Sequence, residues 1–286
     1  MNVRSFALLC LLAPLTCVRP VHAAQSYDNC SGTIASLPAV INSQGTWCMK
    51  QDLATAITSG AAITVNTNNV TIDCNDYKLG GLAAGAGTQA YGVLANTRTN
   101  VTVRHCNIRG FLIGLFFLGT GAGHVVEDNR FDGNTHVGMV VAGDGSVIRR
   151  NRITDTGGST VTQDATAIDG EGNADILDNT VSGLAATTGS NADAYGIKAV
   201  SDPNGRIIGN GIAGLVHDGT GKVFGITMFG AGHLVLRDND VSGDGSAGSV
   251  GISCYDSQGT AKDNVTTGFV TAINACSDGG GNYNNP

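Results

Sequence analysis

Three charged side chains near the middle of the chain are placed to act together if this region is extended. Asp169 and Glu171 are separated by one residue, and alternate residues of a strand point to the same side. Lys198 occupies the position of Asp169 one sequence repeat later, and Tyr195 comes just before it. Carboxylates can bind a cation or transfer protons, a lysine can remove a proton, and a tyrosine can donate one. These residues are therefore the first candidates for binding or catalysis.

A recurrent asparagine defines the repeat that positions them. The asparagines are spaced by 22, 28, 31, 29 and 25 residues. They are Asn129, Asn151, Asn179, Asn210, Asn239 and Asn264. Cys74 and Cys106 fill the same slot in two earlier repeats. A slot that recurs at such intervals is typical of a solenoid, and a stack of identical amides can bond from coil to coil, so we interpret these asparagines as structural.

Each repeat contains two short β-branched runs separated by turn residues, which predicts strands. Strands without crossover helices must wind into coils, and stacked coils pair in parallel about 4.8 Å apart. Alignment on the asparagine slot gives about eight coils. The inward residues of the second strand then form one aliphatic row: Val93, Leu115, Met139, Ile168, Ile197, Ile226, Ile252 and Ile273.

The outward neighbours of that row locate the candidate residues. The first outward row reads Leu94, Phe116, Val140, Asp169, Lys198, Thr227, Ser253 and Asn274. The second reads Asn96, Leu118, Ala142, Glu171, Val200, Phe229, Tyr255 and Cys276. Lys198 should lie one coil from Asp169, so that their side chains can meet. Long turns at residues 156–166, 184–194 and 215–223 should bring Asp164, Asp193, His217 and Asp218 to one rim beside them.

Several interpretations of this patch remain open. The patch could bind a polysaccharide through Asp169, Glu171, Asp164, Asp193, His217, Phe229 and Tyr255. It could be the site of a uronate lyase or epimerase, with Ca²⁺ on Asp169 and Glu171, Lys198 as base and Tyr195 as acid. Asp169 and Glu171, roughly 6–7 Å apart at Cβ, could instead be the carboxylate pair of a glycosidase.

The alternative without chemistry is also open. Asp169 and Lys198 could form an ordinary surface ion pair worth about 0–1 kcal/mol. The protein would then be a non-catalytic envelope scaffold or adhesin.

The N-terminus and the net charge restrict the setting. Residues 1–23 have a basic start, a short apolar run and the cleavage pattern of a signal peptide. No later stretch is apolar enough for a membrane helix. The formal net charge of −7 excludes electrostatic attraction to nucleic acid or anionic membranes. We expect an exported protein, periplasmic or secreted, without nucleic-acid partners or membrane insertion; the oligomeric state is left open.

Six cysteines remain after the predicted signal peptide, and an even number in an exported chain favours disulfides. Cys30 with Cys48 is the first choice. Cys74 with Cys106 and Cys254 with Cys276 would form disulfides or stacked free thiols. We expect residues 24–62 to cap the open end, residues 63–282 to form the solenoid, and residues 283–286 to be a loose tail.

The start of the solenoid also resembles a known group. Gly45–Leu53, Ile63–Val65 and Asn69–Asn75 are similar to the opening of exported right-handed parallel β-helix proteins. That group includes pectate-lyase-like enzymes, alginate lyases and epimerases, and the periplasmic accessory protein of nitrous oxide reductase. The resemblance, over residues 30–282, implies an all-β, single-domain, right-handed parallel β-helix with an N-terminal disulfide cap.

The resemblance says less about activity, because this fold carries many. It implies similar cation, base and acid sets in some β-helix lyases, which normally have an arginine beside the base. No arginine occupies the matching outward row next to Lys198. A copper role by analogy with the accessory protein has no Met or His cluster to support it.

Overall fold

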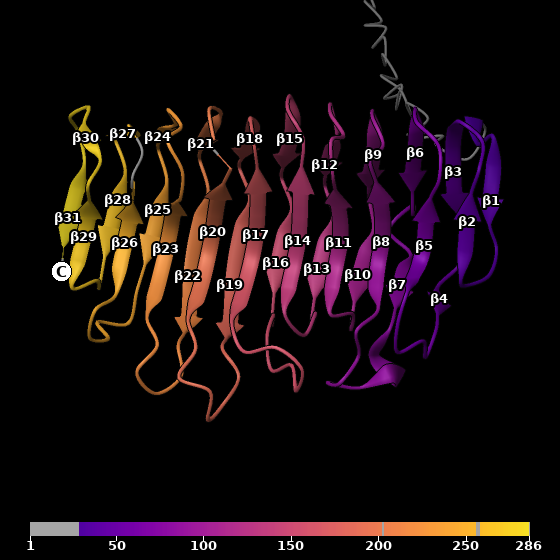
Figure 1. The fold of residues 1–286 in the computed structure, drawn as a ribbon, viewed down its shortest axis with the longest axis horizontal. Coiled ribbons are helices and arrows are strands. Elements are labelled where there is room, and N and C mark those ends of the chain that lie inside the picture. The colour runs from indigo at the N-terminus through magenta and orange to yellow at the C-terminus, as the bar shows by residue number, and fades with distance from the viewer. Residues whose placement is uncertain (1–28, 202, 256–257, 286) are drawn as a thin grey trace, which may run out of the picture.

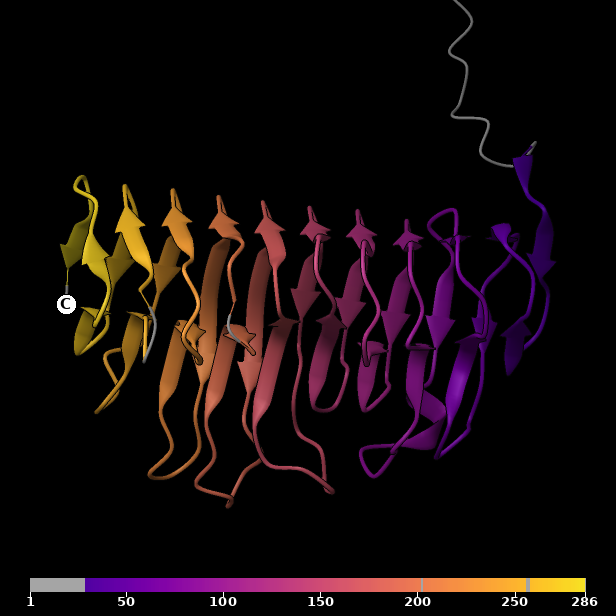
Figure 2. The same cartoon turned by 45° about the horizontal axis from the view of Figure 1, so that its top comes forward.

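The computed structural model describes residues 29–201, 203–255 and 258–285. The predicted signal peptide, residues 1–23, lies outside the described residues. Coils follow one another along a single axis, from the N-terminal end to the C-terminal end (Figures 1 and 2). Apart from one short 3-10 turn, η2 (Leu82–Ala84), the described regular structure is β-strand.

The strands form three parallel sheets, named A, B and C, and a full coil contributes one strand to each. Sheet A contains β1 (Gly32–Ile34), β3 (Gly45–Met49), β6 (Val70–Asp73), β9 (Val101–Arg104), β12 (Val125–Glu127), β15 (Ser146–Arg149), β18 (Ala174–Leu177), β21 (Arg206–Ile208), β24 (Val235–Arg237), β27 (Thr260–Lys262) and β30 (Ser277–Asp278). Sheet C contains β4 (Leu53–Ala54), β7 (Lys78–Gly80), β10 (Asn107–Arg109), β13 (Arg130–Asp132), β16 (Arg152–Thr154), β19 (Thr180–Ala185), β22 (Gly211–Val216), β25 (Asp240–Ser242), β28 (Val265–Thr267) and β31 (Tyr283–Asn285). Sheet B contains β2 (Ala39–Ile41), β5 (Ala61–Val65), β8 (Tyr91–Asn96), β11 (Ile113–Leu118), β14 (Val137–Ala142), β17 (Ala165–Glu171), β20 (Ala194–Val200), β23 (Val223–Met228), β26 (Val250–Ser253) and β29 (Thr271–Asn274).

The solenoid extends further than the sequence repeats alone indicate. Strands β1 to β4, in the segment expected to be a cap, already pair within the three sheets. At the other end, Tyr283–Asn285 forms β31 and pairs with β28, in place of the loose tail expected from the sequence. The predicted all-β solenoid is thus confirmed, with ordered strands beyond both of its expected limits.

The core of the solenoid contains the predicted aliphatic row. Its members pair in register from Val93 to Ile273, and all but Ile273 are completely buried. Burial of one such side chain contributes roughly 1.5–3 kcal/mol. The stacked row therefore holds each coil of sheet B against the next.

A ladder of asparagines runs along the corner between sheets A and C. Asn179 shows the pattern: its side-chain amide donates to the carbonyl of Ile148 and to Oδ1 of Asn210, both at 3.0 Å. Its own Oδ1 accepts from the backbone N–H and the side chain of Asn151, again at 3.0 Å. The ladder consists of Asn129, Asn151, Asn179, Asn210, Asn239, Asn264 and Asn282. The asparagines thus hold the turns, as predicted.

Three disulfides join residues of neighbouring strands and turns. They link Cys30 to Cys48, Cys74 to Cys106, and Cys254 to Cys276. The Cys74–Cys106 bridge occupies the corner that asparagines hold in later coils. Several disulfides in one chain indicate an oxidising, extracytoplasmic location. A membrane-crossing helix is not found in the part of the chain that the structure describes.

Candidate functional site

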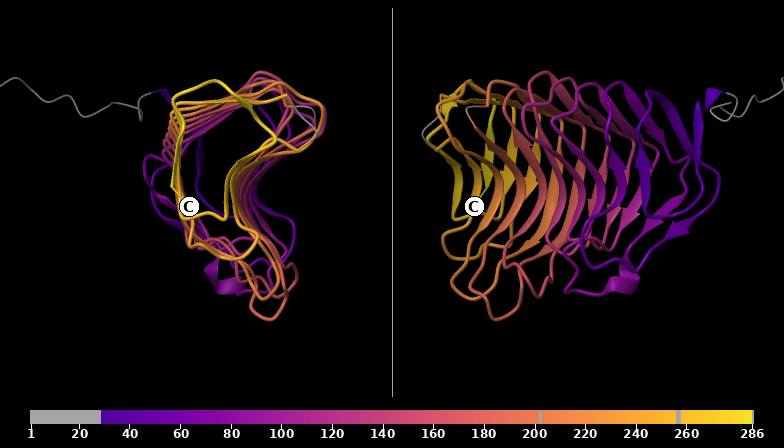
Figure 3. Two further views of the ribbon diagram at one scale, coloured as in Figure 1. Left: turned by 90° about the vertical axis from the view of Figure 1, so that its left-hand side faces the viewer. Right: turned by 45° about the vertical axis from the view of Figure 1, so that its right-hand side comes forward.

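The backbone of sheet B is curved. In the end-on view, the wall that this sheet forms bends inward, and long loops project beyond one edge of it (Figure 3). The first outward row predicted from the sequence is confirmed pair by pair, from Leu94 to Asn274. The row is apolar on β8, β11 and β14 and polar from β17 onward. Polar groups therefore begin in the coils that the sequence indicates.

Asp169 and Lys198 meet on this face, as their register requires. The Lys198 ammonium lies 3.7 Å from Oδ2 of Asp169 and 5.7 Å from the ring centroid of Tyr195. Oδ1 of Asp169 is buried without a hydrogen-bond partner. Burial, assisted by the charge of Glu171 and opposed by Lys198, raises the pKa of Asp169 to about 6. Asp169 therefore changes charge in a mildly acidic solution.

Glu171 is the less engaged carboxylate of the two. It is half-buried, and no hydrogen bond or ion pair with a described residue engages its carboxylate. Two carboxylates supply at most about four oxygens, whereas Ca²⁺ takes six to eight. No group of three or more metal-ligating side chains occurs among the described residues. Calcium on Asp169 and Glu171 would need further oxygen ligands and stays a prediction, and we derive no step through a metal.

Two stacked aromatic pairs flank the polar row. Tyr195 stacks on Phe224 with ring centroids 5.1 Å apart and an interplanar angle of 7°. Phe229 stacks on Tyr255 at 6.0 Å and 5°. Along β20 and β23, Lys198 and Thr227 lie between the two pairs in the chain. The face therefore offers apolar ring surfaces on both sides of its polar groups.

A local turn of the backbone brings Tyr195 to this face. A Cβ built on Gly196 would lie 2.7 Å from the core side chain of Ile212, so position 196 points inward. Ile197 is inward as well and completely buried. Two consecutive inward positions shift the alternation, and Tyr195 lies on the same side as Lys198. Phe224 was missed from the sequence, although it precedes Ile226 as Tyr195 precedes Ile197.

The rim carboxylates predicted from the sequence bind other parts of the rim. Oδ1 of Asp164 accepts from the backbone N–H of Asp193 at 3.1 Å, and Oδ1 of Asp193 accepts from that of Lys222 at 2.7 Å. The Tyr195 hydroxyl donates to Oδ2 of Asp193 at 2.7 Å. Burial and this hydrogen bond raise the pKa of Tyr195, which keeps the phenol protonated. Asp164 and Asp193 thus stack the long loops and orient Tyr195.

Two further residues were predicted at the rim. Oδ2 of Asp218 accepts from the backbone N–H of Asn191 at 2.9 Å. The neighbouring residue is His217, and its ring Nδ1 is buried without a hydrogen-bond partner. No contact between described groups joins it to Asp169 or Lys198. A role for His217 in ligand binding therefore stays a prediction.

Burial decides which groups a ligand can reach. Thr227 and Ser253 belong to the polar row but are completely buried. Lys198 keeps 32% of its side-chain surface, and Tyr255 is 37% exposed. Glu171, Tyr195 and Phe229 are half-buried. These five side chains are accessible to a ligand on this face.

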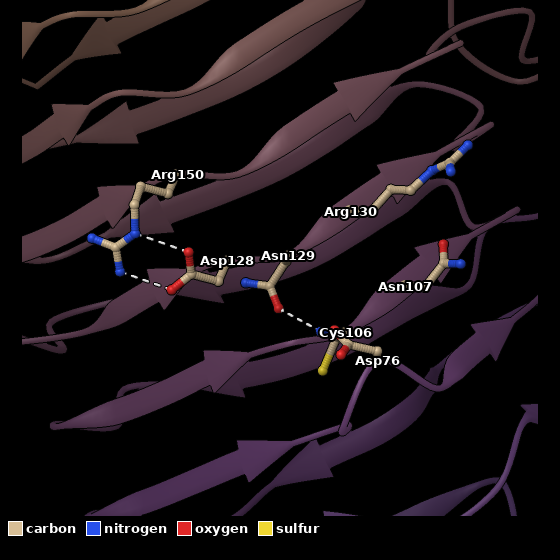
Figure 4. Close-up of a pocket in the computed structure, with 7 residues that line it drawn as sticks. All are labelled: Asp76, Cys106, Asn107, Asp128, Asn129, Arg130 and Arg150. Atoms are coloured by element: carbon tan, nitrogen blue, oxygen red, sulfur yellow. Dashed lines mark hydrogen bonds and ion pairs between the residues drawn. The ribbon is translucent and has the colours of Figure 1, made fainter. Parts of the chain in front are cut away.

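A separate pocket of about 390 Å³ lies outside the ladder corner. Its lining residues are Asp76, Cys106, Asn107, Asp128, Asn129, Arg130 and Arg150 (Figure 4). Arg150 donates two hydrogen bonds to Asp128, at 2.8 and 2.7 Å, and a third to Glu127 at 3.2 Å. Its principal charges are paired, so the pocket presents no evident reactive group.

Comparisons with known proteins agree with the architecture. Residues 33–212, more than half of the chain, match the family described as "Right handed beta helix region". No curated protein matches the sequence.

Solved structures with a similar fold are distant. The catalytic unit of an α-1,3-glucanase from Streptomyces thermodiastaticus is 15% identical, with 87% of this chain and 61% of that one covered and a TM-score of 0.47. The tailspike of E. coli bacteriophage HK620, solved with a pentasaccharide, is 12% identical, with 89% of this chain and 57% of that one covered and a TM-score of 0.45. The A-module of a mannuronan C-5 epimerase from Azotobacter vinelandii is 15% identical, with 89% of this chain and 88% of that one covered and a TM-score of 0.42. This chain spans about three fifths of the first two proteins, and the likeness concerns the fold alone.

Proposed function

The chain belongs to the family of right-handed β-helix regions, and from that fold we propose that it binds a polysaccharide along the outer face of sheet B. The observation that carries the proposal is the pair of aromatic stacks, Tyr195–Phe224 and Phe229–Tyr255, on either side of the polar row. Tyr195 lies on β20 together with Lys198, and Phe224 lies on the neighbouring strand β23.

The chemistry of a sugar ring suits this arrangement. A pyranose has apolar C–H faces, which pack on aromatic rings, and hydroxyls at its edge, which need hydrogen-bond partners. Aromatic side chains supply a large apolar area, and a few polar groups between them fix the orientation of a ligand. Lys198 can donate to a hydroxyl, and Glu171 can accept from one. A solenoid repeats this geometry along its axis, so a chain of sugars can lie over several coils.

A glycan-binding panel tests the proposal. Tyr255→Ala and Phe229→Ala should each weaken binding by roughly tenfold, as loss of an aromatic contact does. Tyr283→Ala is the matched control, because Tyr283 is 60% exposed but lies on sheet C. Equal affinities for the wild type and both aromatic variants would refute a site on this face.

Glycoside hydrolysis is a second candidate at the same place. It is favoured by the pKa of Asp169, which burial and Glu171 raise to about 6. A carboxyl group with a raised pKa beside a second carboxylate is the acid–base pair that glycosidases use. Release of reducing ends that is lost in both Asp169→Asn and Glu171→Gln, while binding persists, would support hydrolysis.

The same samples separate the other possibilities. Unsaturated sugar ends that vanish in Lys198→Ala would favour a lyase with Lys198 as base and Tyr195 as acid. Epimerisation would change the uronate composition without cleavage. Absence of binding and of products over a broad panel would favour an envelope scaffold. The proposal places the protein in the periplasm or outside the cell, where such polymers are accessible.

A further inference from the structure

The charges on the outer face of sheet B are unevenly satisfied. Its ammonium group, Lys198, is engaged by Asp169 at 3.7 Å and by the ring of Tyr195. Glu171 points to the same side of β17 as Asp169 and remains half-buried, and its carboxylate forms no hydrogen bond or ion pair with a described residue. The charge that this face leaves available to a ligand is therefore negative.

The surroundings strengthen this asymmetry. Asp164 and Asp193 lie close enough to Tyr195 to raise its pKa, so two further carboxylates border the site. In the register of Asp169 and Lys198, the neighbouring strands contribute Val140 from β14 and Thr227 from β23, which carry no charge. Carboxylates therefore outnumber the ammonium of Lys198 near this face. A face that carries mainly one sign of charge attracts ligands of the opposite sign and repels those of its own.

The aromatic pair at the strand ends adds a second attraction for cations. Glu171 pairs with Val200 on the next strand, and the backbone N–H of Phe229 bonds to the carbonyl of Ala199 at 2.8 Å. Phe229 and its stacking partner Tyr255 therefore continue the second outward row beyond Glu171 and Val200. Ring faces attract ammonium groups. One sugar could rest on these rings while its neighbour in the polymer reaches the carboxylate.

We infer that the glycan held on this face carries protonated amino groups, and that the site selects amino sugars over uronates. The inference rests on the proposed function and specifies the ligand class of the same site. A sugar ammonium has three N–H donors, which suit the carboxylate of Glu171. A uronate carboxylate would meet Glu171 with like charge, and its natural partner, Lys198, is already paired.

The test compares three oligosaccharides of equal length by titration calorimetry. They are the hexamers of glucosamine, of N-acetylglucosamine and of galacturonic acid. At pH 7, above the pKa of about 6 of Asp169, the glucosamine hexamer should bind at least about tenfold more tightly than its acetylated counterpart. The galacturonate hexamer should bind most weakly. Added salt should narrow the difference, because it screens accessible charges.

Two variants decide whether the preference belongs to this site. Glu171→Gln should bring the affinities for the first two hexamers within about twofold. Asp175→Asn removes a carboxylate from sheet A, where it pairs with Arg206, and should leave the preference intact. This control accounts for general attraction of a polycation to a chain of net charge −7.

The outcomes separate the inference from the proposed function. Equal binding of the amino and acetylated hexamers, tighter binding of galacturonate, or a preference unchanged in Glu171→Gln would overturn the inference. Binding of neutral glycans that still depends on Tyr255 would leave the proposed function standing. If no hexamer binds, and no glycan of the wider panel binds either, both are refuted.

Discussion

The corner between sheets A and C and the outer face of sheet B use the same coils in opposite ways. At the corner, asparagine recurs from coil to coil and its amide is bonded on both sides. On the face, the row changes at each coil, from Val140 to Asp169 to Lys198. Buried polar atoms of Asp169 and Thr227 there lack hydrogen-bond partners. Repetition therefore accompanies stability, and departures from it indicate where a ligand could bind.

The largest effect on stability should come from removing the disulfide at the corner between sheets A and C. A double change, Cys74→Ala with Cys106→Ala, removes a buried bridge between residues 32 apart. The chain-entropy estimate predicts a loss of about 4 kcal/mol in the free energy of unfolding. Urea denaturation measures it. The matched change at Cys254 and Cys276, 22 residues apart near the C-terminal end, should be milder, and the reverse order would contradict this account.

Breaking the amide ladder in mid-molecule should have the next largest effect. Asn179→Ala leaves the buried backbone N–H of Asn151 and the carbonyl of Ile148 without these partners. Each such group costs about 1–3 kcal/mol, so we expect a loss of about 3 kcal/mol in unfolding free energy. Asn66→Ala, at an exposed asparagine with one side-chain bond to Asn42, is the control. Similar losses in both variants would argue against the ladder as a stabilising element.

On the outer face of sheet B, a substitution should stabilise the protein instead of destabilising it. Asp169 has a pKa raised from 3.8 to about 6, so its ionisation is less favourable in the folded state than in the unfolded state. Asp169→Asn should therefore stabilise the protein by about 2–3 kcal/mol at pH 7.5. The gain should shrink through pH 6 and disappear near pH 4, where the carboxyl group is protonated in the folded state. Urea curves at these pH values measure it, and a variant less stable at pH 7.5 would show that the pair with Lys198 is net stabilising.

His124 should give the smallest effect, opposite in sign to that of Asp169. It is 2% exposed, packs on Phe117 with ring centroids 4.8 Å apart, and accepts the N–H of Val101 at 3.4 Å. Burial lowers its pKa below 6.5. The contribution of neutral His124 to the free energy of unfolding is complete above about pH 6.5. It is lost as the pH falls through the lowered pKa of the folded state. His124→Gln should flatten this part of the stability profile between pH 7 and pH 5; an unchanged slope would assign it to other groups.

The features that repeat could be predicted from the sequence. The ladder positions, the aliphatic row and the register of Asp169 with Lys198 all follow from one alignment of coils. The three cysteine pairs could be proposed on the same alignment, although spacing alone did not exclude free thiols. Asn282, the last asparagine of the ladder, was missed because its repeat is the shortest, at 18 residues from Asn264.

The features that depend on curvature could not be predicted. Alternation places Thr227 on the outer face, but the inward bend of sheet B and its neighbours bury it completely. The loop carboxylates Asp164 and Asp193 were expected to face a ligand, whereas backbone N–H groups of adjacent loops engage them. Loop geometry is set by such contacts between coils, which no local pattern in one repeat reveals.

The asparagine ladder also has an electrical direction. Each side-chain amide donates toward the next coil and accepts from the one before, so the amide dipoles point the same way along the axis. As in a helix, aligned dipoles leave a partial positive charge at the donor end. There the amide of Asn282 donates to Oδ1 of Asp278 at 2.8 Å. A carboxylate thus neutralises the positive pole of the row and satisfies its last donor.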